Sequence, residues 1–271
     1  MSDKIEQPSQ AGEYDEKLQR LLQLIWGDGF LSPGGPEEID CLLAGHDIRG
    51  LAVLDIGAGL GAVDELLVRR HGAASVIGID IDPELLRQMD RRIEHARLSD
   101  RVHSVCVAPG PMPFTADSFD VVFSKDSMVQ IPDKPAVFAD IARVMRPGGR
   151  FIASDWLRGG SGPYSADMME YFRLEGIAYN MASPAESAEA LARAGFIDVT
   201  LRDRTDWYLA LARRELDTLG GRLRPTITEQ LGADQADHFV ANWRQLVLVL
   251  ATGELRPHYL VGSKPRPPVI T

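Results

Sequence analysis

The stretch Val53-Leu54-Asp55-Ile56-Gly57-Ala58-Gly59-Leu60-Gly61 decides the fold of this chain. An apolar run that includes one acid leads into three closely spaced glycines, and a helical pattern of apolar residues begins at Val63. This order is typical of a buried parallel strand, a tight turn and the start of a helix. Gly57 and Gly59 supply positive φ angles and leave room for a cofactor beside the backbone. The stretch therefore predicts a nucleotide-binding turn.

Two carboxylates beside this turn indicate which nucleotide it binds. Asp55 stands two residues before Gly57, and Asp80 ends the next predicted strand, at the distance expected of a ribose-binding acid. A carboxylate at Asp55 repels a pyrophosphate but suits a cation. S-adenosylmethionine carries a sulfonium, an ammonium and a ribose but no phosphate, so the two acids favour it over NAD. The alternative, a purely structural turn, leaves both acids without a role.

The composition is that of an ordinary globular protein. Of its 271 residues 45% are hydrophobic and 25% are charged, and the net charge is −10, so we expect no nucleic-acid partner. The two cysteines and six histidines show no ligand spacing, so we expect no metal. No apolar run reaches the roughly 20 residues of a membrane span, and the N-terminus lacks a signal-peptide pattern. We therefore expect a cytoplasmic protein without membrane contact.

Strands and helices alternate through the middle of the chain. Strands are predicted at 51–56, 75–80, 102–107, 119–124, 149–155, 196–202 and 257–263. Helices are predicted at 14–26, 37–44, 61–71, 83–97, 134–145 and 183–194, with further helical material at 206–252. This pattern predicts an α/β fold with a doubly wound, mostly parallel, seven-stranded Rossmann-like sheet. The ligand then lies beyond the carboxyl ends of the strands.

Residues 50–155 resemble class I S-adenosylmethionine-dependent methyltransferases. The motifs that carry this resemblance are the glycine turn with Asp55, the acid Asp80, Phe119-Asp120-Val121-Val122 and Val144-Met145-Arg146-Pro147-Gly148-Gly149. A narrower resemblance is to the phosphoethanolamine (phosphobase) N-methyltransferases, and a looser one is to the sarcosine and dimethylglycine N-methyltransferases. The narrower resemblance is carried by Tyr14, Ile25-Trp26-Gly27, Phe30-Leu31-Ser32-Pro33-Gly34-Gly35 and Ser124-Lys125-Asp126-Ser127.

The phosphobase resemblance implies roles for individual residues. Tyr14 would close over cofactor and substrate, Ser32 would touch the cofactor, and Asp126 would face the acceptor amine. The predicted cofactor site comprises Tyr14, Ser32, Asp55, Gly57, Gly59, Asp80, Ile81 and Lys125. The predicted substrate site comprises Asp126, Trp156 and Tyr179. A less favoured alternative is an aromatic cage for a quaternary amine, formed by Trp207, Tyr208 and Tyr259.

Three positions depart from the phosphobase pattern. Gln130 stands where the family has a proton-transferring histidine, Ala108 where it has an adenine-contacting acid, and Ile177 where it has a phosphate-binding arginine. A glutamine forms hydrogen bonds but accepts no proton at neutral pH. We predict N-methylation of a small polar amine, with Asp126, Tyr14 and Gln130 as the catalytic residues. The alternatives are S-methylation of a thioether such as methionine, and a non-catalytic cofactor-binding module.

The chain is expected to comprise three parts. Residues 1–10 are expected to form a disordered tail, residues 11–48 an N-terminal helical cap, and residues 49–271 the methyltransferase domain. Segments at about 157–182 and 206–252 are expected to form a helical lid. The second of these segments fits either a substrate lid or a dimer surface, so the sequence leaves monomer and homodimer open.

Overall fold

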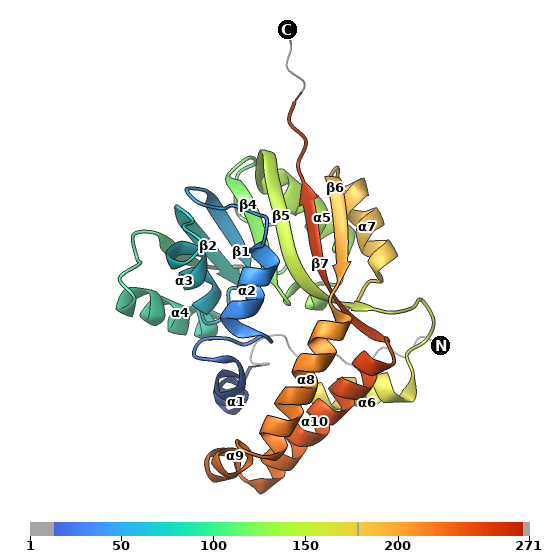
Figure 1. Ribbon diagram of the computed structural model, residues 1–271. Helices are drawn as coiled ribbons and strands as arrows, with labels where there is room; N and C mark the ends of the chain where they lie inside the picture. The colour runs from blue at the N-terminus through green and yellow to red at the C-terminus, as the bar shows by residue number, and fades with distance from the viewer. Residues whose placement is uncertain (1–13, 178, 268–271) are drawn as a thin grey trace.

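A seven-stranded sheet forms the centre of the computed structural model, which describes residues 14–177 and 179–267. The strands are β1 (Ala52–Ile56), β2 (Ser75–Asp80), β3 (Val102–Cys106), β4 (Phe119–Lys125), β5 (Met145–Arg158), β6 (Ile197–Asp203) and β7 (Leu255–Ser263). Their order is β3-β2-β1-β4-β5-β7-β6, and β7 runs antiparallel to both of its neighbours (Figure 1). The predicted mostly parallel, doubly wound sheet is confirmed.

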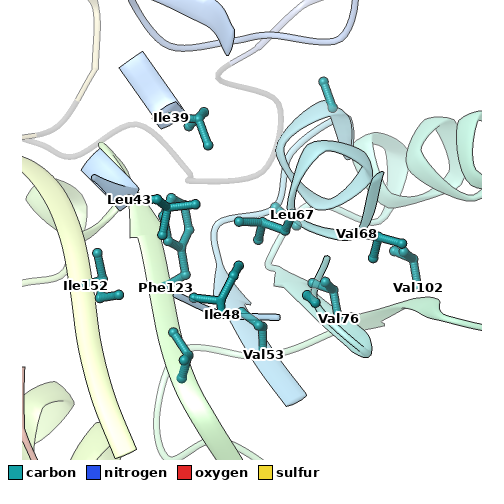
Figure 2. Close-up of a cluster of buried hydrophobic side chains, with 14 of the residues drawn as sticks. Ile39, Leu43, Ile48, Val53, Leu67, Val68, Val76, Val102, Phe123 and Ile152 are labelled. Atoms are coloured by element: carbon teal, nitrogen blue, oxygen red, sulfur yellow. The ribbon is translucent and has the colours of Figure 1, made fainter. Parts of the chain in front are cut away.

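Helices cover both faces of this sheet. One face carries α2 (Gly35–Leu43), α3 (Ala62–Arg69) and α4 (Pro83–His95), and the other carries α5 (Lys134–Val144) and α7 (Pro184–Arg193). Alternate side chains of a strand point to opposite faces, so neighbours in the chain join different cores. Val53 packs with Ile39 and Leu67 in the first core (Figure 2), whereas Leu54 packs with Phe138 in the second.

A third layer lies beyond the carboxyl ends of the parallel strands (Figure 1). It consists of α1 (Glu16–Trp26), α6 (Ala166–Glu175), α8 (Thr205–Gly220), α9 (Arg224–Leu231) and α10 (Ala233–Ala251), which share an apolar core of their own. The buried carboxylate of Glu215 accepts the indole N–H of Trp26 at 2.7 Å and that of Trp243 at 3.0 Å. These two bonds fasten α1 to α8 and α10, so the helices form one layer.

The predicted N-terminal cap divides between two layers. Leu21 and Leu22 of α1 lie in the core of the helical layer, whereas Ile39 and Leu42 of α2 lie in the core on the sheet. Each helix buries its apolar face against a different part of the protein. The predicted tail at residues 1–10 lies outside the described residues.

The strand predicted at 149–155 begins earlier, at Met145. Met145 pairs with Phe119 of β4, and the register then shifts before Val121 pairs with Arg150. The turn residues around Gly148 therefore lie in an irregular start of β5 and not ahead of it. In the described part of the chain no helix is both long and apolar enough to cross a membrane.

Candidate active site

A cavity of about 680 Å³ lies between the carboxyl edge of the sheet and the helical layer. The loops after β1, β2 and β4 line one side of it, and α1, α6 and α10 line the other. Of the residues assigned to the site from the sequence, all but Asp55 line this cavity: Tyr14, Ser32, Gly57, Gly59, Asp80, Ile81, Lys125, Asp126, Gln130, Trp156 and Tyr179.

The turn after β1 is fastened to the end of β2. The backbone N–H groups of Gly57 and Ala58 donate to the carbonyl of Ile79 at 2.8 and 3.0 Å, and that of Gly59 donates to the carboxylate of Asp80 at 3.0 Å. These bonds hold the carboxylate of Asp80 at the cavity wall. Gly57 and Gly59 have the predicted positive φ angles, +83° and +54°.

The missing side chain of Gly57 makes room for the protein itself. A Cβ at Gly57 would overlap the side chain of Ser127, whereas one at Gly59 would meet only Leu31, at 3.5 Å. The Ser127 hydroxyl donates to the carbonyl of Ile56 at 2.7 Å, which joins the loop after β4 to the end of β1. Gly57 thus allows two site loops to lie side by side.

Asp55 departs from the expectation that it faces the ligand. Its side chain is 1% exposed, lies outside the cavity lining, and faces the carboxyl group of Asp64 in the first turn of α3. The alternation of strand β1 sends Asp55 to the same face as Val53, beneath α3. Burial, together with the charges of Asp64 and Asp80, raises the pKa of Asp55 well above its ordinary value, and burial raises the pKa of Asp64 to about 7. The pair therefore retains a proton at neutral pH.

Asp126 directly follows the end of β4 and adopts a left-handed conformation, with φ +56°. Non-glycine residues adopt this conformation rarely, and aspartate tolerates it better than most. Its N–H donates to the carbonyl of Ser154 at 2.8 Å, and one carboxylate oxygen accepts the Ser154 hydroxyl at 2.7 Å. The other oxygen pairs with the ammonium of Lys125, which also donates to the Tyr208 hydroxyl at 3.2 Å. A carboxylate oxygen accepts more than one hydrogen bond, so Asp126 retains acceptor capacity toward the cavity.

Lys125 lines the cavity, but its ammonium is committed to Asp126 and Tyr208. Lys125 was predicted to contact the cofactor, but its ammonium is already bonded within the protein and is not available to a ligand. Its ammonium instead offsets the negative charge of Asp126.

The short helix η1 (Met128–Gln130) carries Gln130 to the cavity. Two buried charged groups hold η1 from behind: the carboxylate of Asp155 accepts the Val129 N–H at 2.8 Å, and the ammonium of Lys134 donates to the carbonyl of Met128. Burial raises the pKa of Asp155 to about 7, and the charge of Lys134 opposes that rise. The position of Gln130 thus depends on a polar support beneath the loop.

The aromatic cage considered from the sequence is already filled by the protein. The guanidinium of Arg204 lies 4.5 Å from the ring centroid of Trp207 and 4.8 Å from that of Tyr259. Arg204 also forms an ion pair with the buried carboxylate of Glu38 at 2.9 Å. Neither Trp207, Tyr208 nor Tyr259 lines the cavity. The rings of Trp207 and Tyr259 thus bind the guanidinium of Arg204 in place of a ligand cation.

Acidic side chains dominate the charged groups of the cavity. Its described lining includes six carboxylates, Asp80, Asp82, Asp126, Asp133, Asp140 and Glu175, but only two basic groups, Lys125 and Arg143. Arg143 is committed to Asp140 at 2.7 Å and to the carbonyls of Met112 and Phe114. Both basic groups of the lining are therefore paired within the protein and unavailable to a pyrophosphate. A cationic cofactor with a ribose suits the carboxylate of Asp80 better. Over the described ranges, no group of three or more potential metal ligands occurs.

Glu175 and Asn242 also line the cavity, and neither was predicted from the sequence. Glu175 ends α6, Asn242 lies on α10, and the Asn242 side-chain N–H donates to the Glu175 carboxylate at 2.5 Å. No short motif joins two residues so far apart in the chain. The available signal was weaker: Asn242 interrupts the apolar face of a helix that also presents Trp243 and Leu246 to the cavity.

Comparisons with known proteins agree with this geometry. Residues 53–149 match the family model described as a methyltransferase domain. Phosphoethanolamine N-methyltransferase 1 of Arabidopsis thaliana is 29% identical over 269 residues, which cover 94% of this chain and 53% of the plant protein. The chain therefore spans about half the length of this curated relative.

Solved structures share the fold over nearly the whole chain. Phosphoethanolamine N-methyltransferase 2 of Haemonchus contortus, in complex with phosphomonomethylethanolamine and S-adenosylhomocysteine, has a TM-score of 0.86 at 23% identity, covering 96% of this chain and 61% of that one. A putative sarcosine dimethylglycine methyltransferase from Galdieria sulphuraria has a TM-score of 0.80 at 18% identity, covering 95% and 100%.

Residues 53–149 thus match a methyltransferase domain, and the chain has the Rossmann-like fold of the solved methyltransferases. More narrowly, it resembles the phosphoethanolamine N-methyltransferases over almost its whole length.

The structure predicts different costs for alanine at the two glycines of the turn. Both substitutions place a side chain in a left-handed conformation, at about 1–2 kcal/mol. Gly57→Ala must also displace Ser127, so we expect it to lower the free energy of unfolding by about 1–3 kcal/mol more than Gly59→Ala does. Urea denaturation of both variants measures this difference. Equal costs would show that the contact with Ser127 does not constrain the turn.

The buried Asp55–Asp64 pair predicts a pH dependence of stability. Between pH 4 and pH 7 the folded protein holds a proton on Asp64 that the unfolded chain releases, so the free energy of unfolding falls as the pH rises through this window. Asp64→Asn removes this titration. Relative to the parent protein, we expect the variant to gain about 1–3 kcal/mol between pH 5 and pH 8.

Urea denaturation at several pH values tests this expectation. Asp100→Asn, at an exposed aspartate, is the matched control and should run parallel to the parent protein at every pH. Parallel curves for Asp64→Asn as well would contradict the prediction.

Proposed function

We propose that this protein is an S-adenosylmethionine-dependent methyltransferase that methylates the nitrogen of a small polar amine. One observation carries the proposal: the enclosed carboxylate of Asp126 and the glycine turn beside Asp80 open onto the same cavity. The methyltransferase domain match and the resemblance to phosphoethanolamine N-methyltransferases support it.

The residues present suit this cofactor. The carboxylate of Asp80, held by the N–H groups of Gly59 and Asp82, offers acceptors for the two hydroxyl groups of a ribose. Ser32 and Tyr14 line the cavity from the N-terminal segment, and Ile81 lines it beside Asp80. When bound, S-adenosylmethionine supplies a methyl group on a sulfonium, whose carbon–sulfur bond breaks with its electron pair left on sulfur as an amine lone pair attacks the carbon.

Asp126 serves the acceptor amine. The carboxylate accepts a hydrogen bond from the ammonium form, takes its proton so that the lone pair becomes available, and offsets the positive charge that develops on the methylated nitrogen. Ser154 and Lys125 fix the carboxylate, so little reorganisation accompanies the reaction. Gln130 cannot take the proton, so Asp126 is the proton acceptor and Gln130 orients the amine. Much of the rate then comes from positioning in an enclosed cavity.

Asp126→Asn should lower kcat by about 10²–10⁴-fold, because the amide keeps the shape of the carboxylate but cannot accept the proton. Binding of S-adenosylhomocysteine should remain. Asp198→Asn is a matched control: Asp198 has the same left-handed backbone, with φ +53°, but lies on β6 outside the cavity. Activity is measured as transfer of the labelled methyl group from S-adenosylmethionine to each member of a panel of amines and thioethers. Transfer to thioethers alone would favour S-methylation, and no transfer to any acceptor would favour a non-catalytic module.

Calorimetry with S-adenosylhomocysteine and with NAD tests the cofactor. We expect S-adenosylhomocysteine to bind and NAD not to bind. The pyrophosphate of NAD would meet carboxylates in this cavity, and both basic groups of the described lining are already paired within the protein. Asp80→Asn should weaken S-adenosylhomocysteine by about tenfold or more, since it replaces charge-assisted hydrogen bonds to the ribose by neutral ones. Tight binding of NAD would overturn the cofactor assignment.

A further inference from the structure

The carboxylate of Glu175 is the one charged group of the described cavity lining without a structural partner of opposite charge or a backbone N–H. The other acids are engaged: Asp80 holds Gly59, Asp82 caps α4, Asp133 caps α5, Asp140 pairs with Arg143, and Asp126 pairs with Lys125. Glu175 receives only the neutral amide of Asn242. Glu175 is partly buried, and a partly buried carboxylate without a cation has a desolvation cost that a cationic ligand would offset.

The position of Glu175 on its helix adds to the negative potential. Glu175 is the last residue of α6, and Gly176 follows it in the left-handed conformation, with φ +72°. The carbonyl end of a helix carries a partial negative charge and favours cations. Helix end and carboxylate therefore act in the same direction at this end of the cavity.

Asn242 supplies a second acceptor beside Glu175. Its side-chain N–H is committed to the carboxylate, and its side-chain oxygen is buried without a hydrogen-bond donor from the described residues. The residue is 6% exposed and lines the cavity. An unsatisfied buried oxygen costs about 1–3 kcal/mol, so a ligand that donates hydrogen bonds is favoured here. The Glu175 carboxylate and the Asn242 side-chain oxygen together favour a ligand that donates several N–H groups.

Tyrosine rings complete this end of the cavity. Tyr171 and Tyr179 both line it, and their hydroxyl groups lie 3.3 Å apart. Burial, with the charge of Glu175 among the further causes, raises both phenol pKa values well above the ordinary value, so both rings remain neutral. Faces of neutral aromatic rings attract ammonium groups.

We propose that Glu175, Asn242, Tyr171 and Tyr179 bind a second ammonium group of the methyl acceptor, so that the substrate is a small diamine. This assignment rests on the proposed function, since it names the class of amine that the same site methylates. One amine faces Asp126 and reacts, while the other remains charged at the α6–α10 end. A phosphomonoester would instead meet the Glu175 carboxylate and an unpaired oxygen, with Lys125 and Arg143 already committed.

Calorimetry on the full chain saturated with S-adenosylhomocysteine tests the proposal. The probes are 1,3-diaminopropane, propylamine of the same length with one amine, and phosphoethanolamine. We expect the diamine to bind at least tenfold more tightly than either of the others, because the second ammonium gains charge-assisted hydrogen bonds.

Glu175→Gln should remove this preference, with a loss of about tenfold or more in diamine affinity and little change for propylamine. Glu170→Gln is the matched control: Glu170 lies on the same helix, is paired with Arg173 at the surface and changes the net charge equally. The control should bind the diamine as the parent protein does, and both variants should bind S-adenosylhomocysteine unchanged, which also shows that they fold.

Other outcomes overturn the proposal in distinguishable ways. Phosphoethanolamine binding as tightly as the diamine, no binding of the diamine, or an unchanged preference in Glu175→Gln would reject the diamine site while leaving amine methylation intact. A selective loss of S-adenosylhomocysteine affinity in Glu175→Gln would assign Glu175 to the cofactor instead. No binding of S-adenosylhomocysteine by the parent protein would reject the proposed function, and the diamine substrate with it.

Discussion

Three consecutive amide groups hold this site together. The N–H groups of Gly57, Ala58 and Gly59 all donate to the end of β2, which fixes the turn after β1 against the neighbouring strand. The chain passes from β1 to β2 on one side and later returns to β4 on the other, so the loops above these strands diverge. That divergence opens the cavity at the carboxyl edge, as in other doubly wound sheets. The missing side chain at Gly57 admits the β4 loop, which brings Asp126 to the same cavity.

The acids in and near the cavity differ in how the protein compensates their negative charge. Asp55 and Asp64 face each other in the interior and share the cost of burial by retaining a proton, so an acid within a nucleotide-binding motif need not touch the nucleotide. The negative charge of Asp126 is offset by the ammonium of Lys125, so the carboxylate stays in a fixed position as a hydrogen-bond acceptor. Glu175 has no such cation, because its carboxylate receives only the neutral amide of Asn242, so its negative charge is uncompensated at the α6–α10 end of the cavity.

The two halves of the cavity come from different parts of the chain. The methyltransferase family model covers residues 53–149, which supply the glycine turn, Asp80 and Asp126. The opposite wall comes from α1, α6 and α10, outside that range, and the Trp26–Glu215–Trp243 hydrogen bonds join two of these helices to one another through α8. A helical layer of this kind can change the acceptor while the cofactor half stays the same, and so fold alone does not name a substrate.

The sequence by itself determined the sheet, its helices and the loops at the strand ends that line the cavity. Those features are local: the period of apolar residues, the glycines and the strand-end acids lie within short segments, and strand ends of a parallel sheet must meet at one edge. Only the tertiary structure decided that Asp55 turns inward beneath α3, that Arg204 fills the Trp207–Tyr259 cage, and that Glu175 meets Asn242 across 67 residues. These outcomes depend on which helices pack together, and burial and pairing of charge follow from that packing and not from spacing along the chain.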